Sequence, residues 1–380
     1  MRAIVVGAGP AGAAAAIELA RAGTDVVLLD RCAWPRPKTC GDGISPLGIR
    51  EGAALGVRIE GAVRLGDALV TTPRGTSFIG GWPSPTPWGT TVERDELDAL
   101  LVTRAMEVGV RFLPATSVRS LAVATNGVTA SVTDGAGESS VTADVVVLAE
   151  GASGGLAAKA GFPPHRSRLV AVRGYAQARS PLPARYGLFY DRFLTPGYGW
   201  IFPVDEFRAN VGVCVDPRVL AREHGDARAL LGRWLAQGAA PRSILGVGAP
   251  LEDVRGGIIP SGRRRRAKPR VYLVGDAAGV ADPFTAEGIF QAMQSGRLAA
   301  RALTDAPNLA QAARRYERAL RELDRNERTA RRLRATFNLT IEPYARHAAA
   351  RRAYADALMT DVFFPKHSFA GFVWNLTRRW

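Results

Sequence analysis

The sequence has few cysteines and histidines and no long hydrophobic run, and each shortage argues against a class of protein. Its three cysteines, Cys32, Cys40 and Cys214, are too few and too scattered for a disulfide framework or for a zinc or iron–sulfur site. The four histidines lie in no recognisable motif, so no metal is expected. No stretch approaches the roughly 18 uninterrupted apolar residues of a transmembrane helix. We therefore expect a protein of the cytoplasm.

Lysine is also scarce, since only four of the 50 basic residues are lysine, and the formal net charge is +15. A GC-rich genome is one explanation of such an arginine preference, and a basic binding surface is the other. Two regions are especially rich in basic residues: the loop at residues 263–270, and residues 314–352, which contain 12 arginines and five acidic residues. No aromatic interleaving accompanies them, so nucleic acid is not an expected partner. Contact with an anionic lipid surface, or with an acidic substrate or carrier protein, fits this charge better.

The first thirty residues carry the strongest motif. An apolar run, residues 4–6, leads into Gly7-x-Gly9-x-x-Gly12, followed by an alanine-rich helix to about Ala22 and a second strand, residues 25–29, ending in Asp30. The first glycine permits a tight turn, the second lets backbone amides approach a pyrophosphate, and the third lets helix and strand pack closely. The helix N-terminus attracts phosphate, and Asp30 is placed to accept hydrogen bonds from a ribose. The pattern predicts a dinucleotide-binding unit.

Further along the chain, residues 144–149 and 271–274 are unbroken apolar segments typical of buried parallel strands. Residues 91–107 and 286–302 read as helices, and residues 110–142 as a β-meander. Between residues 160 and 260, short β patterns with Pro- and Gly-rich turns indicate an antiparallel sheet. The tail from Asn308 is helical, with an aromatic end (Phe363, Phe364, Phe369, Phe372, Trp374, Trp380) that suggests a lid, a dimer contact or a membrane-surface element.

Three separated motifs together resemble flavoproteins of the glutathione-reductase-type FAD fold: GAGPAG with its acid, ADVVVLAEGAS at 143–153, and VYLVGDAAG at 271–279. The resemblance implies that Asp276 accepts hydrogen bonds from the ribityl chain of FAD. It also implies that the helix after it points its N-terminus at the flavin ring. The expected fold is α/β, with a Rossmann-type FAD-binding domain built on a parallel sheet, an antiparallel-sheet substrate domain and a helical C-terminus.

More specifically, residues 1–305 resemble the geranylgeranyl reductase family, which includes actinobacterial menaquinone reductases. The resemblance rests on PKTCGDG at 37–43, VAVRGY at 170–175, PGYGWIFP at 196–203 and DPFTAEGI at 282–289. It implies that the Cys40 segment lies near the flavin and that the aromatic segment lines a tunnel for a prenyl chain. Ala286 stands where the family usually has glycine, which puts the substrate in question more than the cofactor.

The resemblance assigns the site residues. The cofactor-binding set is Gly7, Gly9, Ala11, Gly12, Asp30, Arg31, Lys38, Gly41, Arg94, Gly151, Gly275, Asp276, Gly288 and Ile289. Cys40, Tyr198 and Trp200 are the catalytic candidates, and Tyr198, Trp200, Phe202 and Pro283 the substrate-binding ones. The expected domains are residues 1–70, 90–160 and 268–305 for FAD, residues 71–89 and 161–267 for substrate, and the helical segment 306–380.

Several of these residues have a second interpretation. Cys40 either lies beside the flavin or is simply a small residue in a cofactor loop. Tyr198, Trp200 and Phe202 alternate along a strand, so they share one face that is either a substrate wall or an ordinary core. Glu287, near a helix start, either favours the helix dipole or donates a proton.

Three functions remain open on the sequence. The first is a reductase that saturates C=C bonds of an isoprenoid or polyene by hydride transfer from reduced flavin. The second is an FAD-dependent monooxygenase, because one fold supports both reactions. The third is a flavin-bound protein with a non-redox role. There is no second GxGxxG, so electrons are expected from NAD(P)H that visits transiently or from a separate reductase.

Overall fold

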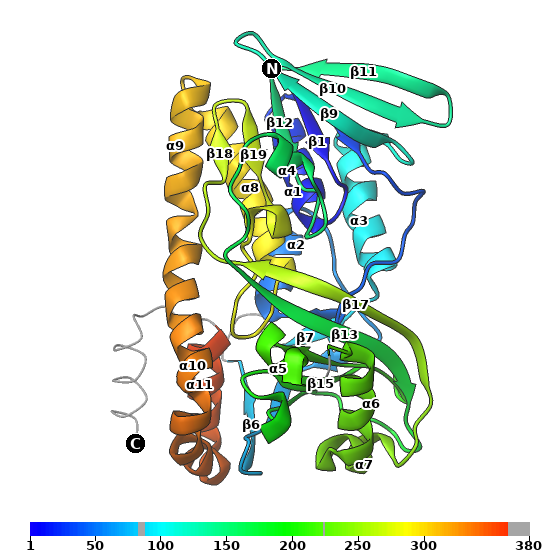
Figure 1. Cartoon of the computed structure of the whole chain (residues 1–380), viewed down its shortest axis with the longest axis vertical. Helices are drawn as coiled ribbons and strands as arrows, with labels where there is room; N and C mark the ends of the chain where they lie inside the picture. The colour runs from blue at the N-terminus through cyan, green and yellow to red at the C-terminus, as the bar shows by residue number, and fades with distance from the viewer. Residues whose placement is uncertain (83–87, 223–224, 364–380) are drawn as a thin grey trace.

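The computed structural model describes residues 1–82, 88–222 and 225–363 (Figure 1). Its first layer is a six-stranded sheet in the order β18-β19-β12-β1-β2-β8, parallel except where β18 pairs antiparallel with β19. The predicted parallel strands around residues 4, 27, 146 and 272 are confirmed. The bounds are β1 Arg2–Val6, β2 Asp25–Leu29, β8 Arg111–Leu113, β12 Val145–Leu148, β18 Ala267–Lys268 and β19 Val271–Leu273.

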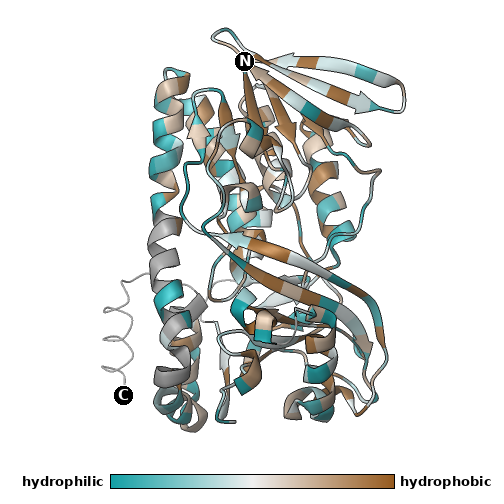
Figure 2. Cartoon of the chain, in the orientation of Figure 1, coloured by the Kyte–Doolittle hydropathy of each residue, from teal (hydrophilic) through white to brown (hydrophobic). Residues whose placement is uncertain are grey.

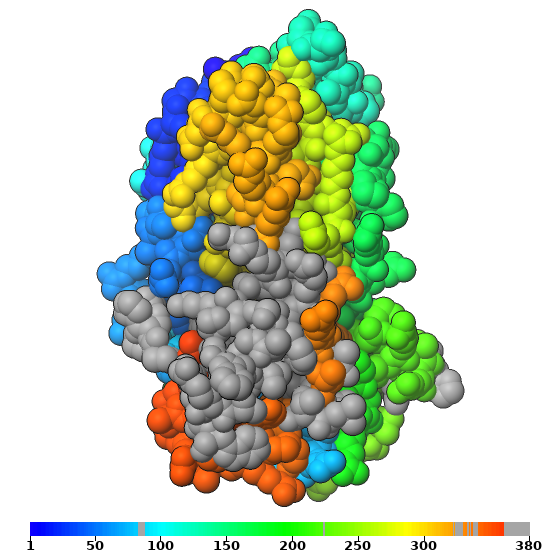
Figure 3. All heavy atoms as spheres, turned by 90° about the vertical axis from the view of Figure 1, so that its left-hand side faces the viewer, coloured from blue at the N-terminus to red at the C-terminus, as the bar shows by residue number. Residues whose placement is uncertain are grey.

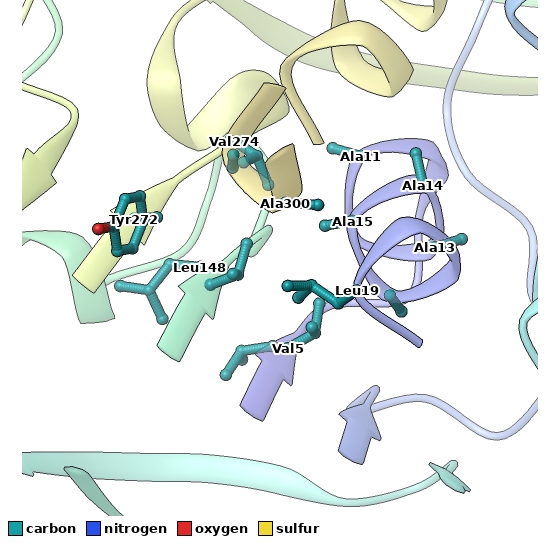
Figure 4. Close-up of a cluster of buried hydrophobic side chains, with 14 of the residues drawn as sticks. Val5, Ala11, Ala13, Ala14, Ala15, Leu19, Leu148, Tyr272, Val274 and Ala300 are labelled. Atoms are coloured by element: carbon teal, nitrogen blue, oxygen red, sulfur yellow. The ribbon is translucent and has the colours of Figure 1, made fainter. Parts of the chain in front are cut away.

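Two helices pack closely beside this sheet. Alanine-rich α1 (Pro10–Arg21) and α8 (Ile289–Asp305) approach so tightly that a Cβ on Gly296 would overlap the Ala11 carbonyl oxygen. Figure 4 shows Ala15 of α1 opposite Ala300 of α8, with Val5 and Leu148 of the sheet beside them. Small side chains therefore set the spacing that holds the glycine turn against the rest of the site.

A separate three-stranded antiparallel sheet contains β9 (Ser117–Val123), β10 (Val128–Asp134) and β11 (Gly137–Ala143). The predicted meander is confirmed for these strands. The prediction was wrong for its first segment, because β8 pairs parallel with β2 in the large sheet. Val110 and Phe112 of this segment pack in the hydrophobic core of the large sheet.

The second large sheet has seven strands in the order β17-β13-β16-β15-β14-β5-β6 and is antiparallel except between β14 and β5. Helices α5 (Pro217–Arg222), α6 (Ala227–Gln237) and α7 (Ala239–Leu245) pack with it, and Trp234 is fully buried there. β5 crosses the domain boundary expected at residue 70. The strand bounds are β5 Asp67–Thr71, β6 Ser77–Gly81, β13 Ser167–Gln177, β14 Tyr186–Phe189, β15 Tyr198–Pro203, β16 Arg208–Val215 and β17 Leu251–Ser261.

Short elements connect the two large sheets. A small sheet joins β3 (Gly43–Ile44), β7 (Gly89–Thr91) and β4 (Arg64–Leu65). Helix α3 (Arg94–Glu107) follows β7. It begins three residues later than the helix predicted over residues 91–107, because residues 89–91 form β7. Helix α2 (Pro46–Ala54), helix α4 (Leu156–Lys159) and the 3-10 turn η2 (Gly275–Ala278) complete this region.

The C-terminal helices are α9 (Leu309–Ala319), α10 (Arg321–Ala350) and α11 (Arg352–Phe363). They run along one side of both layers, and Figure 3 shows α9 in the upper part and α11 in the lower part of that face. Met359 packs against Gly80 of β6. Figure 2 shows mixed hydropathy along these helices, and none among the described residues has the length and apolar character to cross a membrane. The aromatic end expected at residues 363–380 lies outside the described residues, including the Phe363 side chain.

Candidate active site

The glycine turn between β1 and α1 has one open position. A Cβ on Gly7 would overlap the Ala149 carbonyl oxygen, and one on Gly12 would overlap the Gly7 carbonyl oxygen. A Cβ on Gly9 would instead meet only guanidinium nitrogens, of Arg36 at 3.7 Å and Arg94 at 3.9 Å. Gly7 and Gly12 therefore serve the backbone turn and packing, while Gly9 leaves room beside two cations. This arrangement fits a pyrophosphate.

Asp30 follows β2 and is buried. Its Oδ2 accepts hydrogen bonds from the Ala8 amide at 2.9 Å and from Arg36 Nε at 3.3 Å, and its Oδ1 accepts from the Cys32 amide at 3.0 Å. The carboxylate thus ties the end of the second strand to the glycine turn.

A fully buried carboxylate, Asp98 of α3, holds both cations. Arg94 donates to it through Nε and Nη2, each at 2.9 Å, and Arg36 donates through Nη1 at 3.2 Å. Paired donation of this kind fixes the guanidinium plane. Sequence reasoning missed Asp98, although its position four residues after Arg94 on a helix was a usable signal.

The loop that carries Cys40 is fixed by Asp42 and Asn210. Asp42 has φ of 60°, and its Oδ2 accepts hydrogen bonds from Tyr175 at 2.6 Å and from Asn210 Nδ2 at 2.7 Å. Asn210 Nδ2 also donates to the Cys40 carbonyl oxygen at 3.0 Å, and its Oδ1 accepts from Trp200 Nε1 at 2.9 Å. Burial raises the pKa of Asp42 to about 6, against the lowering effect of the two hydrogen bonds. None of Asp42, Tyr175 and Asn210 was among the predicted site residues.

Cys40 is held as a thiol. Burial raises the pKa of its thiol above the ordinary value, and Asp42 adds to this effect, while the Arg94 guanidinium acts in the opposite direction. A neutral thiol is a proton carrier rather than a nucleophile.

The aromatic residues of β15 form one face, as the alternation predicts. Tyr198 and Trp200 lie in the core cluster on the cavity side, with Phe202 packed against it, whereas Ile201 lies in the cluster on the opposite side. A Cβ on Gly41 would lie 3.3 Å from Trp200 Nε1, and one on Gly43 would lie 3.1 Å from the Phe202 ring. The glycines of the Cys40 loop therefore let it lie directly against this wall.

The opposite side of the site comes from the segments after β19. Burial raises the pKa of Asp276, while Lys38 and Arg94 oppose that shift. In the loop from Asp282 to Glu287, Asp282 N–H donates to the Glu287 carbonyl oxygen at 2.8 Å, and Ala286 N–H donates to the Asp282 carbonyl oxygen at 3.0 Å. Ala286, the departure from the family pattern, adopts φ of 58°, a conformation in which glycine is more at ease.

These elements enclose one cavity of about 900 Å³. Nearly all predicted site residues line it: Gly7, Gly9, Ala11, Asp30, Arg31, Lys38, Cys40, Gly41, Arg94, Gly151, Tyr198, Trp200, Phe202, Gly275, Asp276, Gly288 and Ile289. Gly12 and Pro283 do not. Gly12 packs against the turn, and Pro283 is buried, with its carbonyl oxygen accepting a hydrogen bond from Arg334 of α10 at 2.8 Å. The open glycine turn, the paired cations and Asp276 around one cavity fit FAD.

Comparison with known proteins agrees with this geometry. Residues 1–179 match the FAD binding domain family. The menaquinone reductase of Mycobacterium tuberculosis is 32% identical over 344 residues, covering 81% of this chain and 77% of that protein. Digeranylgeranylglycerophospholipid reductase 2 of Methanopyrus kandleri is 32% identical over 311 residues, covering 80% of this chain and 76% of that protein.

Solved structures share the fold. A geranylgeranyl bacteriochlorophyll reductase-like protein from Thermoplasma acidophilum superposes with a TM-score of 0.83 at 20% identity, covering 99% of this chain and 98% of that one. A flavin-dependent brominase gives a TM-score of 0.76 at 18% identity, covering 100% of this chain and 99% of that one. Because proteins of different activity share this fold, sequence relatives decide the family. The chain belongs to the geranylgeranyl reductase family of FAD-dependent oxidoreductases.

Proposed function

We propose that this protein reduces C=C bonds in the prenyl chain of a hydrophobic isoprenoid substrate. The observation that carries the proposal is the single cavity that runs from the glycine turn at Gly9 to the aromatic wall of Tyr198 and Trp200. The names of the two relatives, a menaquinone reductase and a digeranylgeranylglycerophospholipid reductase, support a substrate with isoprene units.

In this proposal the cofactor-binding residues named above hold FAD. The turn amides near Gly9, with Arg36 and Arg94, bind the pyrophosphate, and Asp276 binds the ribityl hydroxyls. When bound and reduced, FAD supplies a hydride. The chain itself orients the prenyl group between the Cys40 loop and the faces of Tyr198, Trp200 and Phe202. Their burial also keeps water out, which matters because an isolated alkene accepts hydride only when it is tightly positioned.

Two further features of the proposal concern partners. The electrons come from NAD(P)H that visits transiently or from a separate reductase. The substrate comes from a lipid surface or a carrier, and the exposed arginines of α9 and α10, such as Arg314, Arg318 and Arg332, suit an anionic surface.

The test is product analysis under single-turnover conditions. The holoenzyme is reduced with dithionite without oxygen and mixed with a menaquinone or with digeranylgeranylglycerophospholipid in detergent. Mass spectrometry of the extracted lipid should show a gain of two hydrogens in the prenyl chain. If the lipid is unchanged in the absence of oxygen but gains one oxygen atom in air, the protein is a monooxygenase and the proposal is wrong. Repeating the assay with NADH, NADPH or a ferredoxin in place of dithionite identifies the donor.

A further inference from the structure

Glu287 lies where the cofactor and substrate parts of the cavity meet. It lines the cavity and precedes Gly288, where a Cβ would lie 3.9 Å from Asp276 Oδ1. It also faces Tyr186, whose ring centroid lies 5.0 Å from that of Phe202. Its loop is rigid, because Asp282 Oδ1 accepts hydrogen bonds from the Phe284 and Thr285 amides at 2.9 and 2.7 Å. The sequence left two interpretations of this residue open.

The carboxyl group of Glu287 is held in one orientation. The Ser45 hydroxyl accepts a hydrogen bond from the Gly48 amide at 3.2 Å and gives its only hydrogen to Glu287 Oε1. Gln291 of α8 donates a second hydrogen bond to the same carboxyl group. These two hydrogen bonds fix the orientation of the carboxyl group toward the cavity that it lines.

Three other polar groups on the substrate side of the cavity wall already donate their hydrogens within the protein. The Tyr198 hydroxyl donates to the Thr285 carbonyl oxygen, Trp200 Nε1 donates to Asn210, and the Tyr186 hydroxyl donates to the Ile44 carbonyl oxygen at 2.7 Å. Tyr198 and Trp200 are therefore positioning residues for the substrate. Four acidic groups with a raised pKa line the cavity: Glu287, the Cys40 thiol, Asp42 and Asp276. In the proposed function Asp276 binds the ribityl hydroxyls of FAD, which leaves the other three to release a proton toward the substrate.

We propose that Glu287 is the proton donor of this reduction. The inference rests on the proposed function. Hydride from reduced FAD forms a C–H bond at one alkene carbon, and the electron pair of the π bond takes the carboxyl proton of Glu287 at the neighbouring carbon. The O–H bond breaks, Glu287 is left as a carboxylate, FAD is left oxidised, and solvent returns the proton in the next cycle.

The electrostatics of the loop support this role. Burial raises the pKa of Glu287 to about 7, and the nearby Asp282 carboxyl raises it further, while the hydrogen bonds from Ser45 and Gln291 lower it. The other titratable group that faces it is Tyr186 of β14, and Arg334 of α10 faces Asp282. A carboxyl group with this pKa is about half protonated at neutral pH and is suited to general acid catalysis. Asp42 is the weaker candidate, because its side chain is almost fully buried whereas Glu287 is only half-buried.

The first experiment compares Glu287→Gln with wild type and with Asp42→Asn as the matched carboxyl control. Dithionite-reduced holoenzyme is mixed with digeranylgeranylglycerophospholipid in detergent, and hydrogenated product is measured after rapid quenching between pH 5 and pH 9. In wild type the rate should be constant in acid and fall about tenfold per pH unit above a pKa near 7. Glu287→Gln should be about 10²–10⁴-fold slower, with FAD still bound. In Asp42→Asn the rate should fall at alkaline pH with the same apparent pKa as in wild type; this fall is the alkaline limb of the rate–pH profile.

A second measurement does not depend on turnover. The infrared difference spectrum of oxidised wild-type holoenzyme against Glu287→Gln should contain a protonated-carboxyl C=O band that disappears as the pH rises through about 7. Ser45→Ala should move that titration, and the alkaline limb of the rate, to higher pH, because it removes a hydrogen bond that stabilises the carboxylate.

The outcomes separate the two proposals. If wild type hydrogenates the lipid and Glu287→Gln does so with the same rate and pH profile, this inference is overturned while the proposed function stands. Loss of the alkaline limb in Asp42→Asn instead would assign the proton to Asp42. If wild type hydrogenates neither the phospholipid nor a menaquinone, the proposed function fails, and the inference fails with it.

Discussion

Asn210 Nδ2 donates a hydrogen bond to Asp42 Oδ2 at 2.7 Å, joining β16 to the loop that carries Cys40 across 168 residues of sequence. The same side chain accepts from Trp200 Nε1 at 2.9 Å, so one buried amide fixes the loop and the aromatic wall relative to each other. The width of the cavity at this point therefore depends on a residue that does not line it.

Asn210→Ala should lower the free energy of unfolding by about 2–4 kcal/mol, because it removes three hydrogen bonds in the interior and leaves Asp42 Oδ2 with only the one from Tyr175. Urea unfolding followed by tryptophan fluorescence measures the change. Gln177→Ala, at an exposed position of the adjacent β13, is the control and should change stability by less than about 0.5 kcal/mol. Equal stability of both variants would mean that the loop is held by other contacts.

The sequence predicted the parts of the fold that depend on local patterns. The glycine turn, the parallel strands and the alternation of Tyr198 with Ile201 all follow from short-range chemistry. The sequence could not predict pairs such as Asp42 with Tyr175, 133 residues apart, because no local pattern shows which distant strand will lie beside a loop. Asn210 gave a weak signal, as a polar residue inside an otherwise apolar strand.

Gly9→Ala and Gly12→Ala should separate cofactor binding from folding. The structure has room for a Cβ at Gly9, so this variant should keep its thermal stability, but the methyl group would occupy the approach to the pyrophosphate. Its dissociation constant for FAD, measured by flavin fluorescence, should rise about tenfold or more. A Cβ on Gly12 would overlap the Gly7 carbonyl oxygen, so Gly12→Ala should lose about 3 kcal/mol or more of stability. Unchanged FAD affinity in Gly9→Ala would place the pyrophosphate elsewhere.

His165 should contribute to acid sensitivity. Burial, together with Arg264 and Arg266, lowers the pKa of His165 to about 4, and Arg264 Nη1 lies 2.9 Å from its Nε2. The unfolded chain binds a proton near pH 6.5 while the folded protein does not, so stability present above pH 6.5 is lost as the pH falls toward 4. The difference in unfolding free energy between wild type and His165→Gln should therefore change between pH 6.5 and 4. A constant difference would mean that the folded and unfolded pKa values of His165 are equal.

Part of the basic loop at residues 263–270 is occupied inside the protein. Arg266 is buried and donates through Nε to the Ala278 carbonyl oxygen at 2.9 Å, and Lys268 donates to the Ala160 carbonyl oxygen. Arg266 thus stabilises the turn after β19, and Lys268 stabilises the end of α4, so both charges are engaged within the protein. Any contact with anionic lipid is therefore better tested with charge reversals on exposed α9 residues such as Arg314.

Trp200→Ala and Ile201→Ala test whether the aromatic face of β15 serves substrate or only the core. Both side chains are nearly fully buried, but Trp200 lines the cavity and Ile201 packs on the opposite side of the sheet. Trp200→Ala should lower kcat/KM about 10–100-fold while FAD stays bound, because the substrate loses the surface that orients it. Ile201→Ala should cost about 2–5 kcal/mol of stability, with kcat/KM of the folded fraction unchanged.

The measurements are steady-state hydrogenation of a menaquinone, flavin content after gel filtration, and urea unfolding. Loss of flavin from Trp200→Ala would instead make this strand a support for the cofactor loop, since Trp200 lies directly behind Gly41.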